Sequence, residues 1–224
     1  MTFSIVARSS DARLFGVAIV SSSPAVAARC AHGRAGVGAV ATQNVTDPAL
    51  GPRLLDALAR GSTAPEALSE TLAATPFGAY RQLLAIAGSG PPAVHSGAQG
   101  LGVVGAAIGA DAAAAGNLLA RESVPAVMIE AFGQSAGHLG DRLMEALRAG
   151  LGAGGEAGPV HSAGLLIVRE VSWPIVDLRV DWTDDDPVAA LEAVWRRFAP
   201  QIDDYVRRAI DPVRAPSFGV RGDA

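Results

Sequence analysis

The chain has 224 residues, of which half are apolar and 18% carry a charge. This balance supplies enough apolar material for a buried core and differs from that of an intrinsically disordered chain. The formal charge of −4, with arginines scattered among acids, gives no concentrated basic face for a phosphate backbone, so we do not expect a nucleic-acid partner.

The chain start and the most apolar stretch bear on localisation. Residues 1–8 run into the polar stretch 9–13 and so lack the apolar core of a signal peptide. Residues 100–120 are rich in Gly and Ala and include Asp111, so no membrane span is expected there. The single Cys30 has no partner for an internal disulfide, which is typical of a reducing compartment. We therefore expect a cytoplasmic protein without a membrane partner.

The first elements in chain order are predicted strands. Residues 2–8 and 14–21 are short β-branched runs separated by Ser-Ser-Asp, the pattern of an antiparallel hairpin, and residues 37–43 form a third run. All three runs are apolar at both alternating sets of positions. The sheet is therefore expected to be covered on both faces.

Two helices are predicted next. Leucines recur every four residues from Leu50 to Leu58, which indicates one buried stripe of a helix that ends at Gly61. Thr63 and Glu66 then have the spacing of a reciprocal capping box at the start of a second helix.

The remaining elements repeat this grouping of like with like. Residues 81–88 and 92–97 predict another hairpin, followed by one helix that opens at Ser123 and a second that ends in the glycines at 150–155. Strands are predicted again at 161–170 and 175–182, and a last helix starts at Pro187 with an apolar stripe reaching Val206.

Grouped strands and grouped helices argue against strict βαβ alternation. We predict an α+β fold: a four-layer αββα sandwich in which two antiparallel sheets pack between helical layers. Residues 1–211 are expected to form a single domain, and the Pro/Gly-rich residues 212–224 a flexible C-terminal tail.

Most motifs suggestive of chemistry have a simpler explanation. The glycines from Gly100 to Gly105 spell G-x-G-x-x-G, but no strand precedes them directly, so a flexible crossover is the favoured interpretation over a dinucleotide site. The four histidines lie far apart in sequence, and neither a metal nor an organic cofactor is expected. Cys30 and His32 fit a buried small residue and its neighbour better than a thiol nucleophile and base. Ser21 begins a polar turn without the context of a nucleophile elbow.

Thr2 is the most informative residue. Its small side chain permits removal of the initiator methionine, after which one residue carries both a hydroxyl and a free α-amine. The unperturbed pKa of an α-amine is near 8, so a fraction is unprotonated at neutral pH and can accept the hydroxyl proton. A threonine after Met1 is nevertheless more often an ordinary strand residue.

Several segments together resemble the DUF1028 family. They are TFSIVAR at 2–8, GVAIV at 16–20, AGVGAVATQ at 35–43, YRQL at 80–83, GNLL at 116–119, SAGLLIV at 162–168 and DLRVD at 177–181. The similarity runs from residue 2 to about residue 196. It implies a fold like that of N-terminal nucleophile hydrolases, with two sheets between helices.

The resemblance implies hydrolysis of an amide C–N bond in a small amide, imide or peptide-like metabolite. Thr2 would be the nucleophile and Asn117 a donor to the developing oxyanion. We assign Arg81, Ser21, Gln43 and His161 as candidate substrate-binding residues. Arg81 can neutralise a substrate carboxylate or simply flank a strand, and Asn117 can equally be a turn residue.

The chain departs from the family pattern at several positions. Val103 and Val104 stand where an aromatic residue and Ala are usual, Ala115 replaces a usual Gln, and His161 and Glu156 stand where Gln and Asp are common. These changes point to a different substrate or to lost activity, so a non-catalytic ligand-binding or assembly module that retains the fold is the alternative. A homodimer or higher homo-oligomer is expected from the high apolar content.

Overall fold

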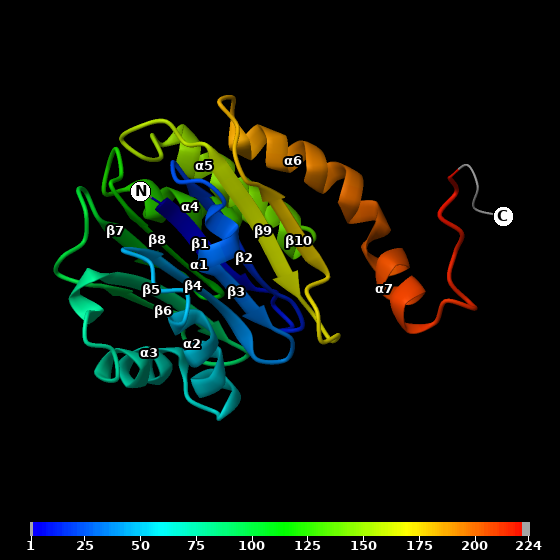
Figure 1. Ribbon diagram of the computed structural model, residues 1–224, viewed down its shortest axis with the longest axis horizontal. Coiled ribbons are helices and arrows are strands. Elements are labelled where there is room, and N and C mark those ends of the chain that lie inside the picture. Colours follow the sequence, from blue (N-terminus) through cyan, green and yellow to red (C-terminus); the bar gives the residue numbers. More distant parts are fainter. Residues whose placement is uncertain (1, 221–224) are drawn as a thin grey trace.

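Alternating apolar side chains build two antiparallel sheets in the computed structural model, which describes residues 2–220 (Figure 1). The larger sheet contains β1 (Thr2–Arg8), β2 (Phe15–Ser21), β7 (Gly105–Ile108), β8 (Ala112–Asn117), β9 (Ser162–Val168) and β10 (Val176–Val180). The smaller sheet contains β3 (Ala31–Arg34), β4 (Gly38–Asn44), β5 (Arg81–Ala87) and β6 (Ala93–Ser96). The strand orders are β10-β9-β2-β1-β8-β7 and β3-β4-β5-β6.

Helices cover the outer face of each sheet. The longer helices are α2 (Leu50–Ala59), α3 (Ala64–Ala73), α4 (Val124–Gln134), α5 (Leu139–Gly152), α6 (Pro187–Phe198) and α7 (Ile202–Ile210). Short helical segments are α1 (Val26–Cys30), η1 (Gly78–Tyr80) and η2 (Ala199–Gln201). Helices α4, α5 and α6 pack on the larger sheet, and α2 and α3 pack on the smaller one.

Three apolar layers hold this arrangement together. One lies between the larger sheet and its helices, one between the smaller sheet and α2 and α3, and the third between the two sheets. The two central strands of the larger sheet, β1 and β2, are therefore buried on both faces, as their unbroken apolar pattern predicts. The expected α+β sandwich of two antiparallel sheets between helical layers is confirmed.

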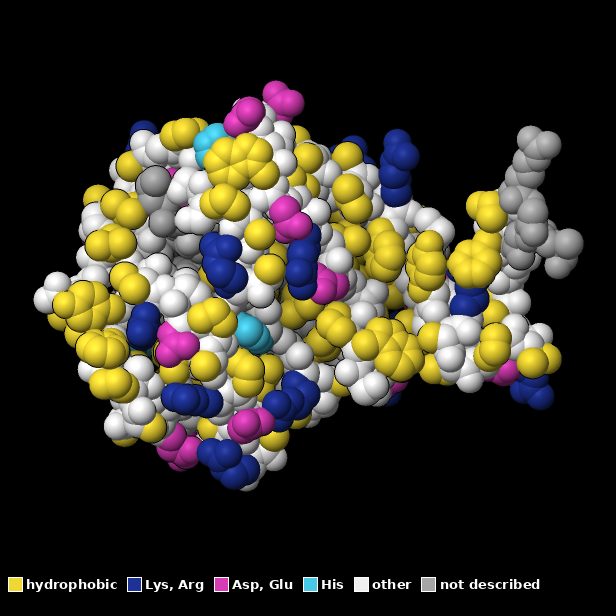
Figure 2. Space-filling view, viewed as in Figure 1, with side chains coloured by type: hydrophobic (Ala, Val, Ile, Leu, Met, Phe, Trp, Pro, Cys, Tyr) yellow, Lys and Arg dark blue, Asp and Glu magenta, His cyan; other side chains and the backbone are white. Residues whose placement is uncertain are grey.

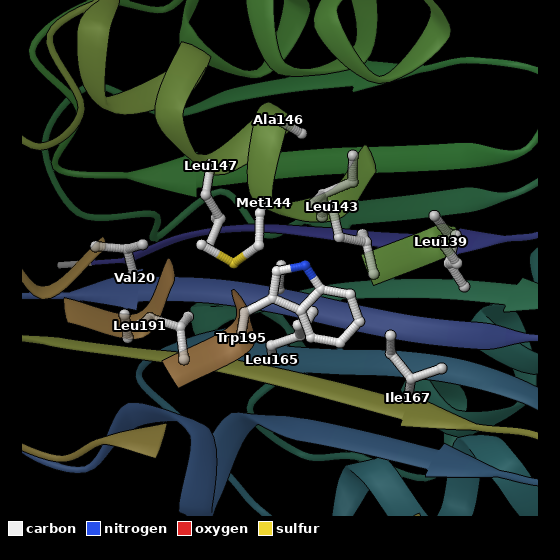
Figure 3. Close-up of a cluster of buried hydrophobic side chains, with 14 of the residues drawn as sticks. Val20, Leu139, Leu143, Met144, Ala146, Leu147, Leu165, Ile167, Leu191 and Trp195 are labelled. Carbon is white, nitrogen blue, oxygen red and sulfur yellow. The ribbon is translucent and has the colours of Figure 1, made fainter. Parts of the chain in front are cut away.

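Trp195 of α6 occupies the middle of the outer layer (Figure 3). Its indole lies among leucines of α5 and the side chains of Leu165 and Ile167 from β9 (Figure 3). The indole N–H donates to Asp141 Oδ1 at 2.8 Å. Because aromatic side chains bury a large apolar area, Trp195 fixes α6 against both α5 and the sheet.

Most predicted elements are confirmed, including the capping box, in which Thr63 and Glu66 bond to each other's backbone N–H. The predicted order omits α1 and β3 at residues 26–34, and it omits β7 and β8, which pair with each other after the loop at 100–104. One expectation was wrong. The last helix is interrupted by η2 at Pro200, because proline has no N–H to continue a helix.

The C-terminal part projects from the body of the molecule (Figure 1). Within it, the guanidinium of Arg208 donates to the carbonyls of Pro216 and Ser217 at 2.9 Å each and lies over the Phe218 ring. Residues 221–224 of the predicted tail lie outside the described residues.

Basic and acidic side chains are interspersed on the face seen in Figure 2. Among residues 2–220, no helix has the length and apolar character needed to cross a membrane.

Candidate active site

The site residues share one face of the larger sheet. Along β1, Phe3 and Ile5 pack toward the outer helices, whereas Val6 belongs to the layer between the sheets. Because strand side chains alternate between faces, Thr2 and Ser4 also point into the space between the sheets. Both are buried although polar.

Thr2 opens β1 at the end of the sheet where β2 and β8 finish. Its Oγ1 lies 3.3 Å from Ser21 Oγ at the end of β2, and in register it faces Asn117 at the end of β8. Ser21 Oγ also accepts the N–H of Ser23 at 3.0 Å, so the turn after β2 holds this hydroxyl in place. Antiparallel pairing thus gathers Thr2, Ser21 and Asn117, which are far apart in sequence.

A chain of side-chain hydrogen bonds links this group to the smaller sheet. Ser4 Oγ donates to Gln43 Oε1 at 2.7 Å, and Gln43 Nε2 donates to Gln82 Oε1 at 2.7 Å. Asn117 Nδ2 donates to the same Gln82 oxygen at 3.2 Å. Buried polar groups are costly unless they are paired, and here each of these amide and hydroxyl donors has an acceptor.

The two glutamines also reach the backbone of β8. Gln43 Nε2 donates to the carbonyl of Ala115 at 3.2 Å, and Gln82 Nε2 donates to that of Gly116 at 3.1 Å and to Ser96 Oγ at 2.9 Å. The small residues of β8 leave room for these amides to approach its main chain. Ala115, which departs from the family pattern, therefore lies beside the candidate substrate-binding residue Gln43.

Two oxygen atoms near Thr2 stand out because they are buried and unpaired within the described part of the chain. One is Asn117 Oδ1 and the other is Glu156 Oε2. The second oxygen of Glu156, Oε1, accepts the N–H of Ser22 at 3.1 Å. Burial raises the pKa of Glu156 to about 7, because the charged form loses its hydration.

Residues 2–191 match the family described as "Family of unknown function (DUF1028)". The chain belongs to the DUF1028 family. A crystal structure of a member from Silicibacter pomeroyi, the protein SPO2555, is similar at 30% sequence identity and a TM-score of 0.84, covering 92% of this chain and 94% of that one.

Anbu (ancestral beta-subunit) from Yersinia bercovieri is 12% identical with a TM-score of 0.37, covering 91% of this chain and 97% of that one. No curated protein matches the chain.

Arg81 of this DUF1028 member lies apart from the Thr2 group, whereas His161 borders the group through its backbone. Arg81 precedes Gln82 and so lies on the opposite face of β5, where its guanidinium donates to the carbonyl of Val45. His161 is tied to the Ser21 carbonyl by its backbone N–H at 2.9 Å, while its imidazole stacks on Trp182 at 4.3 Å and lies 2.9 Å from the Thr183 carbonyl.

Cys30 and His32 form no nucleophile and base pair. Cys30 lies in an apolar cluster with Ile19 and Val26, and burial raises the pKa of its thiol. Burial lowers the pKa of His32, whose Nε2 lies 3.3 Å from the Arg29 carbonyl. Neutral forms of both side chains are therefore favoured.

The glycine motif of this DUF1028 member also lacks the setting of a dinucleotide site. Residues 100–104 form a loop, and Gly105 begins a strand, whereas such a site needs a helix there. In residues 2–220, no three His, Cys, Asp or Glu side chains gather in a group able to hold a metal ion.

Sequence reasoning assigned no role to three members of the buried polar group. Ser4 and Gln82 were treated as parts of strands, and Glu156 only as a departure from the family pattern. A signal for the first two was available, because a polar residue inside an otherwise apolar, doubly covered strand needs a buried partner. Nothing in the sequence indicates that Glu156 reaches Ser22.

Proposed function

We propose that this protein is an N-terminal nucleophile hydrolase that cleaves the C–N bond of a small amide, imide or peptide-like metabolite. The observation that carries the proposal is the buried Thr2 hydroxyl at the start of a central strand, 3.3 Å from Ser21 Oγ and beside Asn117. The α-amine of Thr2 becomes free when Met1 is removed. Met1 lies outside the described residues.

In the proposed reaction, Thr2 Oγ1 attacks the substrate carbonyl carbon while the α-amine takes the hydroxyl proton. The tetrahedral intermediate collapses as the C–N bond breaks, and the proton passes from the ammonium to the leaving nitrogen. Water then attacks the resulting ester, which releases the carboxylic acid and returns the proton to Thr2 Oγ1. The sequence of steps uses no metal and no organic cofactor.

The neighbours of Thr2 have matching roles in this proposal. Asn117 Nδ2 uses one hydrogen toward Gln82, which leaves its second hydrogen for a developing oxyanion. Ser21 Oγ is close enough to orient the Thr2 hydroxyl. Gln43 fixes the inner wall of the site through its bonds to Ser4 and Gln82.

The test combines mass spectrometry with active-site labelling. The chain, expressed with its natural start, should lose Met1 and react at Thr2 with an electrophile selective for N-terminal threonine. Thr2→Ala should abolish labelling, whereas Ser10→Ala, at an exposed position, should leave it unchanged.

Two results would argue against the hydrolase. Full retention of Met1 removes the base that the mechanism needs. A processed chain in which Thr2 stays unlabelled, and in which Thr2→Ala leaves ligand affinity unchanged, would instead support a non-catalytic ligand-binding module.

A further inference from the structure

The backbone around Glu156 ties together the chain segments that flank the start of β1. In the larger sheet, β1 lies between β2 and β8. Glu156 forms an antiparallel bridge with Leu119, just after β8, where the N–H of Ala157 donates to the Leu118 carbonyl at 2.9 Å. Its side chain accepts the N–H of Ser22, just after β2. Glu156 therefore connects the segment after β8, through its backbone, with the segment after β2, through its carboxyl group, next to the first residue of β1.

One carboxyl oxygen at this place is left without a partner. Glu156 is 5% exposed, and its Oε2 accepts no hydrogen bond from any residue in the range 2–220. An orphaned buried carboxylate oxygen is costly and is expected to have a donor in the working state of the protein.

We infer that Glu156 is a positioning residue that accepts a hydrogen bond from the α-amine of Thr2 once Met1 is removed. The inference rests on the proposed function, since the amine exists only in the processed chain. The Thr2 nitrogen begins the strand that the carboxyl passes, and Oε2 is the atom left to receive its N–H. Glu156 would fix the direction of the amine lone pair, which must point toward Thr2 Oγ1 to take its proton.

The charges around the carboxyl set the expected pH behaviour. Burial holds the pKa of Glu156 well above its ordinary range, and the hydrogen bond from Ser22 and the imidazole of His161 oppose this. Among the described residues, His161 is the titratable side chain that acts on the Glu156 carboxyl. A carboxylate stabilises a nearby ammonium, so an ionised Glu156 raises the pKa of the α-amine.

The experiment measures the pKa of the amine directly. The chain contains no lysine, so the α-amine is its one primary amine and reductive methylation with ¹³C-formaldehyde marks that group alone. The NMR signal of the methylated amine is then titrated in the natural chain, in Glu156→Gln and in Glu156→Asp. Glutamine keeps an acceptor for the Ser22 N–H but carries no charge, whereas aspartate keeps the charge.

The pKa of the amine should be about one unit lower in Glu156→Gln than in the natural chain, and Glu156→Asp should restore part of the difference. The same titration of His161→Gln separates the contribution of the imidazole. Equal pKa values in the natural chain and Glu156→Gln, with Thr2 still labelled, would overturn this inference and leave the proposed hydrolase standing. Complete retention of Met1 would overturn both.

Discussion

Asn117 in the larger sheet donates a hydrogen bond to Gln82 in the smaller sheet, 3.2 Å away across their interface. Both side chains are almost fully buried. Gln82 Oε1 also accepts from Gln43, so one amide oxygen holds two amide groups in place. The orientation of Asn117 beside Thr2 thus depends on a residue from the other sheet.

Replacing Gln82 by leucine should destabilise the fold. The substitution leaves one amide hydrogen of Gln43 and one of Asn117 without an acceptor in a buried place, and the cost should be roughly 2–4 kcal/mol in the free energy of unfolding. Chemical denaturation measures it. The matched change Gln134→Leu, at an exposed position of α4, should stay within about 0.5 kcal/mol of the natural chain. Similar losses in both variants would contradict a structural role for the buried network.

Ser21→Ala should slow the labelling of Thr2 by roughly three- to tenfold, because the variant loses one hydrogen-bond partner of the Thr2 hydroxyl. The measurement is the rate of reaction with the threonine-selective electrophile. Ser162→Ala is the control. The Ser162 hydroxyl holds the same turn by bonding to the Ser23 carbonyl and the Val26 N–H, and it does so without bonding to Thr2. If both variants slow labelling equally, the effect belongs to the turn and not to the Ser21 hydroxyl.

Cys30 should react slowly with iodoacetamide in the folded protein at pH 8. Burial raises the pKa of its thiol and so lowers the fraction present as thiolate, the reactive form. Unfolding in urea should increase the alkylation rate at least about tenfold, because it restores both access and the ordinary pKa. Fast alkylation of the folded chain would reopen the question of a cysteine nucleophile.

Gly140→Ala and Gly133→Ala should change stability in opposite directions. A Cβ at Gly140 would lie 2.4 Å from the Trp195 ring, so α5 or α6 must shift and the melting temperature should fall. A Cβ at Gly133, within α4, would meet no atom closer than 4 Å. Alanine there should stabilise the chain by about 0.5–1 kcal/mol, because glycine loses more backbone freedom in a helix. A rise in melting temperature for Gly140→Ala would contradict the packing in Figure 3.

Intrinsic strand propensity explains which strands can be predicted from the sequence and which cannot. β1, β2, β4 and β9 are rich in β-branched and leucine residues, and their ends were found within about two residues. β8 reads Ala-Ala-Ala-Ala-Gly-Asn, which has little intrinsic strand preference, and it forms because β1 and β7 pair with it on either side. The propensity of a segment cannot report a partner that lies far along the chain.

The candidate site divides in the same way. Thr2 and Asn117 were predicted from the chemistry of a terminal threonine and from the family resemblance, and the structure brings them together as cross-strand neighbours. Arg81 was placed with them, but strand parity turns it to the other face of β5. Gln82, its neighbour in sequence, faces the site instead.

The amino-acid sequence by itself determined the class of fold and most of its strands and helices, and it indicated Thr2 as the nucleophile of the proposed function. Periodicity and residue chemistry are local properties that a single segment carries. The tertiary structure alone decided that the buried carboxyl of Glu156 accepts the Ser22 N–H beside the start of β1, and that Gln82, itself bonded to Gln43, holds the asparagine of the other sheet. These relationships arise when segments more than thirty residues apart pack together, and their energy depends on burial that exists only in the folded chain.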